Sequence, residues 1–316
     1  MKIVAIHFPT QVMQLLPASV ATCVADMHVA DLDRIEEIRL RLNRPVEVVG
    51  SDVSIPVVVT QDHLQHVLAA VTGSSLYAVE SELRRGYITI AGGHRVGIAG
   101  RAVVDERGLV KTIRDIGSVS IRIARSAIGS ANALKPVMVD ERGTLLSTLL
   151  IGPPMSGKTT LLRDVARMLG DGRFHPRIHR MRVSIVDERS EIAGCYKGVP
   201  QFDVGLSTDV LDACPKVEGM YMMLRSMAPQ VLLTDEIGSV SDIEAIADVA
   251  RAGVVFIGTL HASSIEDLRI RETLHRFVES ATITRFVFLS RTSGPGTIAR
   301  VFDGRLRELS GPWQSR

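Results

Sequence analysis

Residues 152–159 read Gly152-Pro153-Pro154-Met155-Ser156-Gly157-Lys158-Thr159 and match the pattern G-x-x-x-x-G-K-[ST] at each fixed position. An apolar run from Leu145 to Ile151 precedes this segment. After it, apolar side chains recur at the spacing of one face of an amphipathic helix: Leu161, Leu162, Val165, Met168 and Leu169. The sequence therefore predicts a strand, a glycine-rich loop and a helix in direct succession, which is a building unit of α/β folds with a parallel sheet.

A loop of this composition is suited to bind phosphate. Glycines let consecutive backbone N–H groups turn inward around phosphate oxygens, and the start of the following helix adds its positive dipole end. We expect Lys158 to reach the β- and γ-phosphates of ATP and the hydroxyl of Thr159 to ligate Mg²⁺. The strand and helix on either side argue against the alternative, a chance glycine-rich turn. The predicted nucleotide contacts are Gly152, Pro153, Pro154, Met155, Ser156, Gly157, Lys158, Thr159 and Thr160.

Hydrolysis requires two further groups, an acidic side chain for the metal and one for the attacking water. The run Val231–Thr234 is typical of a buried strand, and two adjacent carboxylates, Asp235 and Glu236, follow it. We expect Asp235 to hold Mg²⁺ through water and Glu236 to polarise the nucleophilic water. An acidic pair that caps a helix is the alternative. The position downstream of a phosphate loop favours the catalytic interpretation.

Two more predicted strands end in polar side chains. The strand at 182–186 runs into an acidic cluster at residues 187–191, and the strand at 254–260 ends at His261. The carboxyl ends of parallel strands meet at one edge of a sheet, where ligands bind. Solvated charge at a strand end would explain each feature taken alone. Their occurrence together with the phosphate loop favours one shared site.

The first part of the chain has a different pattern. Residues 35–49 alternate between apolar and polar and predict a hairpin, Thr60 begins an amphipathic helix, and a second helix is expected around Leu76–Leu83. Short strands are expected at 87–91, 96–104, 109–113 and 119–124. We therefore predict a small α+β domain with an antiparallel sheet over residues 1–125, a linker over 126–143, and an α/β domain with a parallel-rich sheet over 144–316.

Composition excludes several classes of protein. Of 316 residues, 46% are hydrophobic and 23% are charged, which is typical of a globular chain and not of a disordered one. A formal net charge of +2 provides no global field for nucleic acid or anionic lipid. Three cysteines are too few for a disulfide framework and fit a reducing cytoplasm. No apolar run reaches the ~18 residues of a membrane span, so we expect a soluble, cytoplasmic protein.

In this order the motifs resemble those of the secretion ATPases, the hexameric motors of type II and type IV secretion and pilus systems. That family combines a phosphate loop, an acidic segment E-D-x-x-E, a strand ending in glutamate and a T-L-H box. The counterparts here are Gly152–Thr159, Asp187-Glu188-Arg189-Ser190-Glu191, Asp235-Glu236 and Thr259-Leu260-His261, and Arg225 with Pro229 matches the family's R-x-x-x-P approach to that strand. The resemblance implies a RecA-like P-loop motor domain, ATP and Mg²⁺ as cofactors, and a homo-oligomer, expected to be a hexamer.

The match also assigns roles to residues. It implies catalytic roles for His261 and for Glu188, which stands in the family's central acidic position, and a metal role for Asp187. Asp187 stands where the family usually has Glu, and Asp235 where it usually has Gly. Which of Asp187, Glu188 and Glu191 acts in catalysis therefore stays open. The family's tetracysteine insertion and long C-terminal helical region are missing, so contacts to partners do not carry over.

Within that group the chain resembles a sporulation family of endospore-forming bacteria. The segments that carry the likeness are Glu37–Arg41, Gly92–Gly100, Ser120–Arg125, Gly152–Asp164, Asp187–Gly194 and Ser293–Thr297. The resemblance implies a mother-cell ATPase at the inner face of a membrane complex, peripheral to the membrane, which serves a channel to the forespore. Its partners would be the membrane proteins of that channel.

Two other functions are open to a phosphate-loop protein. One is action on nucleic acid, which calls for a basic stripe with interleaved aromatic side chains. Aromatic residues make up only 4% of this chain and the net charge is close to zero, which disfavours that function. The other is a scaffold that nucleotide merely holds together. In such a scaffold we would expect some of the residues required for hydrolysis to be replaced, whereas this sequence contains the complete set.

The motifs above include no mobile cation aimed at the transferred phosphoryl group. An arginine finger there is worth roughly 10³–10⁵ in rate. Arg122 and Arg125 lie at the end of the N-terminal domain, where strand alternation places them on opposite faces and leaves Arg122 the freer to project. A solvated strand arginine is the alternative. The resemblance implies that such arginines reach nucleotide across a domain or subunit boundary, so we expect Arg122 to be the catalytic finger.

Overall fold

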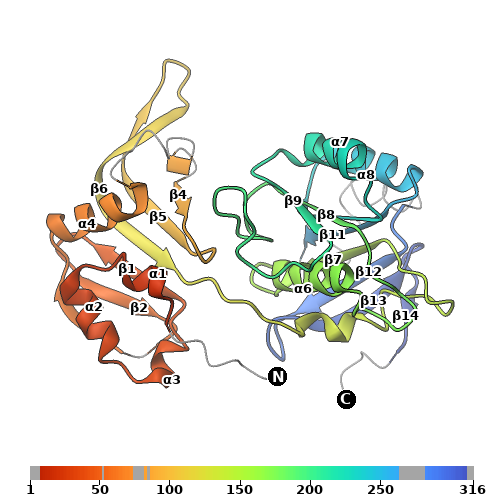
Figure 1. The fold of residues 1–316 in the computed structure, drawn as a ribbon, viewed down its shortest axis with the longest axis horizontal. Helices are drawn as coiled ribbons and strands as arrows, with labels where there is room; N and C mark the ends of the chain where they lie inside the picture. The colour runs from red at the N-terminus through yellow and green to blue at the C-terminus, as the bar shows by residue number, and fades with distance from the viewer. Residues whose placement is uncertain (1–7, 52, 74–81, 84–85, 263–281, 312–316) are drawn as a thin grey trace. The chain divides into compact units, whose positions relative to one another are not determined.

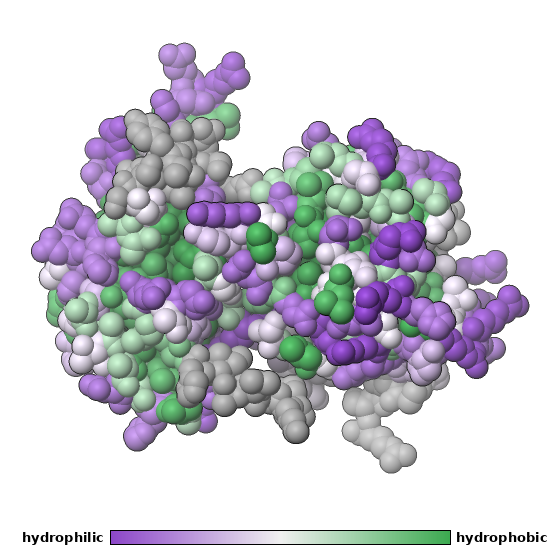
Figure 2. Space-filling model, in the orientation of Figure 1, coloured by the Kyte–Doolittle hydropathy of each residue, from purple (hydrophilic) through white to green (hydrophobic). Residues whose placement is uncertain are grey.

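The computed structural model describes residues 8–51, 53–73, 82–83, 86–262 and 282–311. The chain divides into two compact units, Met1–Arg125 and Ser126–Arg316 (Figure 1). Among the described residues, no helix is both long enough and apolar enough to cross a bilayer. Polar side chains are spread over the visible face of each unit, with apolar ones between them (Figure 2).

The N-terminal unit is built on a six-stranded sheet of order β3-β2-β1-β6-β5-β4, in which every neighbouring pair is antiparallel. Its strands are β1 (Glu37–Arg41), β2 (Pro45–Val49), β3 (Ile55–Val58), β4 (Tyr87–Thr89), β5 (Arg95–Val104) and β6 (Val110–Arg122). Its helices are α1 (Thr10–Met13), α2 (Ala18–Ala25), α3 (Val29–Leu32) and α4 (Gln61–Thr72). The buried face of the sheet packs with α2 and α4 into one core that includes Ile38, Leu40, Val20, Leu64 and Ile121.

Local sequence explains most of this unit. Ile38 and Leu40 are fully buried and alternate with more exposed residues of β1, as the hairpin pattern predicts. Thr60 begins α4 with a capping box, in which its hydroxyl accepts the N–H of His63. The strands expected at 109–113 and 119–124 form one 13-residue strand, β6, which pairs with β5 through two bulges. The helix expected around Leu76–Leu83 lies mostly outside the described residues.

The second unit is an α/β domain with an eight-stranded sheet of order β14-β13-β12-β7-β11-β10-β8-β9. The six strands from β12 to β9 are parallel, and β13 and β14 add an antiparallel edge. The strands are β7 (Thr148–Gly152), β8 (Val183–Asp187), β9 (Thr208–Asp212), β10 (Val231–Ile237), β11 (Val255–His261), β12 (Arg285–Ser290), β13 (Thr297–Asp303) and β14 (Glu308–Leu309). The helices are η2 (Ser130–Leu134), α6 (Lys158–Asp171), α7 (Lys216–Met227) and α8 (Val240–Arg251).

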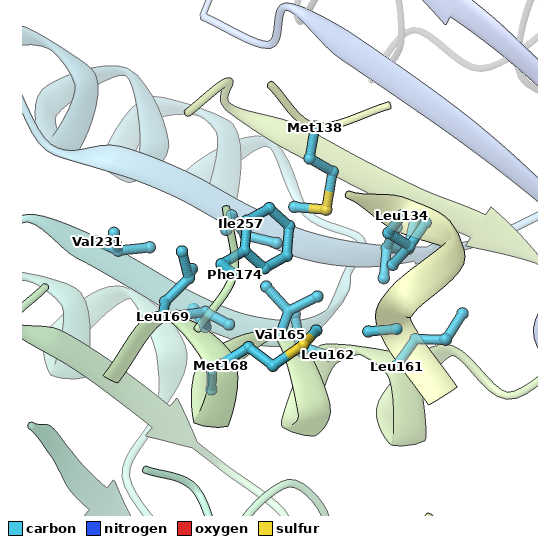
Figure 3. Packing of buried hydrophobic residues seen from close by; sticks show 14 of the residues in the cluster. Leu134, Met138, Leu161, Leu162, Val165, Met168, Leu169, Phe174, Val231 and Ile257 are labelled. Carbon is cyan, nitrogen blue, oxygen red and sulfur yellow. The ribbon is translucent and has the colours of Figure 1, made fainter. Parts of the chain in front are cut away.

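Two hydrophobic clusters cover the two faces of this sheet. On one face α6 packs on Val231 and Ile257, with Phe174 beside them (Figure 3). On the other face, side chains of α7 and α8 pack on Leu232 and Phe256. Burial on both faces explains why these strands are continuous apolar runs rather than alternating ones.

Residues 126–143, expected to be a linker, belong to the core of the second unit. Leu134 and Met138 are fully buried and pack against α6 (Figure 3). The carboxylate of Asp164 on α6 accepts the N–H of Ala131 at 2.9 Å and forms a buried ion pair with Arg167 at 2.7 Å. The segment lacks a strand or helix period because it packs through a 3₁₀ turn and irregular backbone, which periodicity does not detect.

Candidate functional site

The predicted site residues come from strands that are neighbours in the sheet. β7, β11, β10 and β8 lie in that order, and their carboxyl ends carry the phosphate loop, His261, Glu236 and Asp187. The register between β11 and β7 pairs His261 with Gly152. A cavity of about 240 Å³ opens at this edge and is lined by Pro154, Lys158, Thr159, Arg189, Glu191, Asp235, Glu236, Thr259 and His261.

The phosphate loop, residues 152–159, adopts the tight turn that its glycines predict. Gly157 has a φ of 87°, and a Cβ built on Gly152 would lie 2.6 Å from the hydroxyl of Ser156. That hydroxyl is buried and has no hydrogen-bond partner among the described residues. A cradle that a Cβ would fill, with a buried polar atom left for a ligand, fits a phosphate group.

Lys158 is the cation of this loop. Its ammonium group donates to the carbonyl oxygens of Gly152 and Pro153, each at 2.7 Å. Burial lowers the pKa of Lys158, and the negative charge of Glu236 opposes that shift. The side chain therefore lies inside the loop and close to the acidic side of the cavity.

The nine predicted nucleotide contacts do not all occupy equivalent positions. Pro154, Lys158 and Thr159 line the cavity. Thr160 instead lines a separate small cavity with Arg163 and Asp164. The remaining contacts, Gly152, Pro153, Met155, Ser156 and Gly157, form the loop itself and could meet phosphate through backbone N–H groups, Pro153 excepted.

Asp235 is a buried carboxyl group at the cavity wall, with 3% of its surface exposed. Burial raises its pKa to about 7, and the negative charges of Asp187 and Glu191 add to the shift. Lys216 acts in the opposite direction. A buried carboxylate surrounded by other acids favours a divalent cation, because the cation removes the electrostatic penalty of the charge.

Glu236 is held in an unusual backbone conformation. Its φ is 47°, which non-glycine residues seldom adopt, and the pairing of β10 with β11 shifts register between Thr234 and Ile237. The N–H of Glu236 donates to the hydroxyl of Thr259 at 2.8 Å, and its carboxylate forms an ion pair with Arg189. The bulge turns this side chain outward to the cavity while Asp235 beside it stays buried.

The acidic segment is organised differently from the expectation. Asp187 is fully buried, and its two carboxylate oxygens accept the backbone N–H groups of Glu191, Ile192 and Ala193 at 2.8–3.0 Å. Burial raises its pKa, and these hydrogen bonds oppose the shift. Both oxygens thus accept N–H groups of the following loop, so Asp187 anchors that loop, and its expected metal role stays a prediction.

Glu188 and Glu191 point to different surroundings. Glu188 forms an ion pair with Lys216 at 2.9 Å and does not line the cavity. Glu191 does line it, beside Asp235 and Glu236. The structure therefore brings Glu191, rather than the expected Glu188, to the candidate site.

The sequence analysis assigned no role to three residues that lie in or beside the candidate site. Arg189 and Thr259 line the cavity, and Arg163 of α6 donates to the carbonyl oxygens of Glu191 and Ile192. Arg163 stacks on the Phe202 ring with its guanidinium carbon 3.7 Å from the ring centre, and burial lowers its pKa to about 10. No pattern in the sequence marked Arg163, which lies opposite the apolar face of the predicted helix.

Arg122 lies in the N-terminal unit. Its side chain is 66% exposed, with Nε 3.9 Å from the carboxylate of Glu37, whereas Arg125 turns inward and donates to the carbonyl oxygens of Leu32 and Ile35. Arg122 thus projects outward, as alternation predicts. It lines a second, larger cavity of about 380 Å³, which contains no residue of the phosphate loop or of the acidic strands and is therefore distinct from the candidate site.

Solved structures share this architecture. The ATPase DotB of Legionella pneumophila superposes with a TM-score of 0.56 at 16% identity, over 90% of this chain and 78% of that one. The pilus retraction motor PilT with bound ADP gives a TM-score of 0.55 at 14% identity, over 82% of this chain and 75% of that one. At these identities the likeness establishes the fold, and it confirms the predicted α/β class of the secretion ATPases.

Sequence comparison identifies the family. Stage III sporulation protein AA of Bacillus subtilis (strain 168) is 44% identical over 295 residues, which cover 93% of this chain and 94% of that protein. The protein SEEDLING PLASTID DEVELOPMENT 1 of Arabidopsis thaliana is 32% identical over 152 residues, 48% of this chain and 21% of that one. The family described as sporulation stage III, protein AA, matches residues 8–309. The chain therefore belongs to the stage III sporulation protein AA family.

Proposed function

We propose that the chain is an ATPase that works as an oligomeric motor, expected to be a hexamer, and energises a membrane-spanning channel complex during endospore formation. The observation that carries the proposal is the meeting of four groups at one cavity. Lys158 and Thr159 come from the phosphate loop and Asp235 and Glu236 from β10. Phosphate cradle, metal ligands and water-activating carboxylate are the parts that ATP hydrolysis requires.

Nucleotide would bind through the loop, with its metal. The backbone of the loop and the ammonium of Lys158 would hold the β- and γ-phosphates. The hydroxyl of Thr159 and the carboxylate of Asp235 would hold Mg²⁺. Among the described residues there is no cluster of three His, Cys, Asp or Glu side chains that could hold a metal by itself. A magnesium ion held by Thr159 and Asp235 would arrive with the phosphates and keep several waters.

Glu236 would then orient and deprotonate the attacking water. Its carboxylate faces the cavity from a strained bulge, so its position is set by the fold rather than by side-chain freedom. His261 and Glu191 line the same cavity, where His261 would donate to the phosphate and Glu191 would accept from a water. Bound ATP supplies the transferable phosphoryl group.

The role in sporulation rests on the family, and the motor role is inferred by analogy with proteins of the same fold. DotB is named as an ATPase and PilT as a pilus retraction motor. We propose by analogy that this chain assembles into a ring in the mother-cell cytoplasm and docks on membrane proteins of a sporulation channel. Arg122 would complete the ATP site of a neighbouring subunit.

The test is ATP hydrolysis by the purified chain with Mg²⁺, measured over a range of protein concentrations with and without single-stranded DNA. The proposal predicts specific activity that rises with protein concentration and does not respond to DNA. Stimulation by DNA would instead support an ATPase that acts on nucleic acid. Binding of ATP without turnover at any concentration would support a scaffold.

A further inference from the structure

The turn that joins β12 to β13, residues 291–296, lies against the phosphate loop. The N–H of Gly296 donates a 2.8 Å hydrogen bond to the carbonyl oxygen of Ser156. A Cβ built on Gly157 would lie 2.9 Å from that same nitrogen and 3.3 Å from the carbonyl carbon of Pro295. The turn therefore contacts the loop backbone directly at two consecutive residues.

This hydrogen bond fixes the orientation of one peptide group of the loop. The peptide between Ser156 and Gly157 is planar and trans, so its C=O and N–H point in opposite directions. Because the carbonyl of Ser156 points outward to Gly296, the N–H of Gly157 must point the other way, toward the interior of the loop. An N–H in that direction is a phosphate donor.

The turn does not need this hydrogen bond for its own closure. Its internal bonds are those from the N–H of Gly294 to the carbonyl of Arg291, at 3.1 Å, and from the hydroxyl of Thr297 to the carbonyl of Gly294, at 2.8 Å. The N–H of Gly296 is directed away from the hairpin and onto the loop. This donor therefore serves the loop rather than the turn.

β12 also restricts the other fixed glycine of the loop. A Cβ on Gly152 would lie 3.1 Å from the carbonyl oxygen of Leu289, near the end of β12. Both glycines of the motif thus have their Cβ positions blocked by the hairpin, and that of Gly152 is also blocked by Ser156 of the loop. The loop is enclosed from outside by one element that is distant in sequence.

We propose that the 291–296 turn is a positioning element of the nucleotide site, and that Gly296 holds the Ser156–Gly157 peptide so that the Gly157 N–H faces the phosphates. The inference rests on the proposed nucleotide-binding function. It predicts a role in affinity for the phosphates that ATP and ADP share, since the chemical step depends on Glu236 and its water.

Two glycines of the turn provide a matched pair of variants. Gly294 and Gly296 both have positive φ, 101° and 86°, so alanine strains the backbone at either position. A Cβ on Gly294 meets nothing within 4 Å, and one on Gly296 meets only Leu161 at 3.6 Å. Gly296→Ala strains the residue whose N–H donates to Ser156 and adds one ordinary contact with Leu161, whereas Gly294→Ala strains a residue that makes no contact with the loop.

The experiment measures ADP affinity by titration with a fluorescent ADP analogue, and kcat at saturating ATP. Gly296→Ala should weaken ADP binding about tenfold, the effect of one well-formed hydrogen bond in a ligand site. Gly294→Ala should bind ADP within about twofold of the unsubstituted chain. Both variants should keep kcat within about twofold. Gly296→Asn, which tolerates a positive φ, should recover most of the lost affinity.

Thermal melting separates positioning from unfolding. The two alanine variants should lose similar stability, so a difference in ADP affinity between them reports on the loop. Where Gly296→Ala does not fold, Thr297→Val removes a turn bond while keeping both glycines, and it should weaken ADP binding about threefold.

Equal ADP affinity in the two alanine variants would overturn the inference. Where Gly296→Ala does not fold, unchanged ADP affinity in Thr297→Val would overturn it. An unsubstituted chain that fails to bind ADP would overturn the proposed nucleotide site and the inference with it.

Discussion

The backbone N–H of Glu236 and the hydroxyl of Thr259 are joined by a 2.8 Å hydrogen bond across the point where β10 and β11 slip in register. The bond links the T-L-H segment to the carboxylate that we propose as the water activator. The hydroxyl of Thr259 accepts the N–H of Glu236 within this irregular stretch of the sheet. Thr259 therefore supports the position of Glu236 rather than contacting the reacting atoms itself.

The first prediction follows from this bond. Thr259→Val removes the acceptor, so Glu236 relaxes from its left-handed conformation and kcat falls about tenfold, while KM for ATP changes little. Thr259→Ser keeps the hydroxyl and should keep most of kcat. Thr234→Val is the control, because the hydroxyl of Thr234 is also buried in β10 but donates to the carbonyl of Val186 at 2.9 Å. That variant should lose stability without a selective loss of kcat, and an equal fall of kcat in both valine variants would contradict the assignment.

The second prediction distinguishes two carboxylates of the acidic segment. Glu191 lines the cavity, whereas Glu188 is paired with Lys216. Glu191→Gln should lower turnover at saturating Mg²⁺ about tenfold or more, because it removes a group that can reach the metal waters. Glu188→Gln should keep turnover within a few-fold, because Glu188 pairs with Lys216 and does not line the cavity. Steady-state turnover of both variants tests this assignment. A larger loss of turnover in Glu188→Gln than in Glu191→Gln would assign the catalytic role to Glu188 instead.

The third prediction concerns pH and metal. The pKa of Asp235 is raised by burial from 3.8 to about 7. Below that pH a proton competes with Mg²⁺ for the carboxylate. The Mg²⁺ concentration for half-maximal activity should rise about tenfold for each pH unit below 7. Assays at pH 6, 7 and 8 over a range of Mg²⁺ concentrations test this, and a half-maximal concentration that does not change with pH would contradict it.

The same pKa shift has a consequence for stability. The folded chain keeps a proton on Asp235 that the unfolded chain releases above pH 4, so the shift costs stability progressively as pH rises from about 4 to 7. Asp235→Asn removes that cost. Without nucleotide and Mg²⁺, the variant should melt several degrees higher than the unsubstituted chain at pH 8 and at a similar temperature at pH 4. Melting curves at the two pH values test the sign of the effect.

The fourth prediction concerns the arginine finger. Arg122 is exposed in the N-terminal unit, and we propose that it acts on nucleotide held by another subunit. Arg122→Ala should lower turnover about 1,000-fold, the lower end of the effect of an arginine finger, and leave ADP affinity nearly unchanged. Mixing Arg122→Ala with Glu236→Gln, each inactive alone, should restore part of the activity. A mixture shown to co-assemble without recovery would contradict a finger supplied between subunits.

The sequence was sufficient to predict the sheet edge that carries the site. The strands β7, β8, β10 and β11 are buried on both faces, so each is mainly apolar and its end can be predicted from the sequence. Four site residues were predicted from their positions at or just after these strand ends, and all four line one cavity: Lys158, Asp235, Glu236 and His261.

The choice between Glu188 and Glu191 could not be read in this way. It depends on how the loop folds back after β8, where Ser190 has a φ of 54° and Asp187 holds three N–H groups. Arg163 fixes the carbonyl side of the same loop from α6. The contacts of Asp187 depend on an irregular loop, and those of Arg163 join distant segments, so apolar periodicity predicts neither. The packing of residues 126–143 against α6 was missed for the same reason.

The most direct test of the account compares ATP binding and ATP turnover in Lys158→Ala and Glu236→Gln. Lys158→Ala removes the charge that neutralises the β- and γ-phosphates, so both binding and turnover should be lost. Glu236→Gln keeps the phosphate cradle, so ATP affinity should stay within a few-fold of the unsubstituted chain while turnover falls at least 100-fold. Equal loss of binding in the two variants, or turnover retained in Glu236→Gln, would contradict an ATP-hydrolysing site at this cavity.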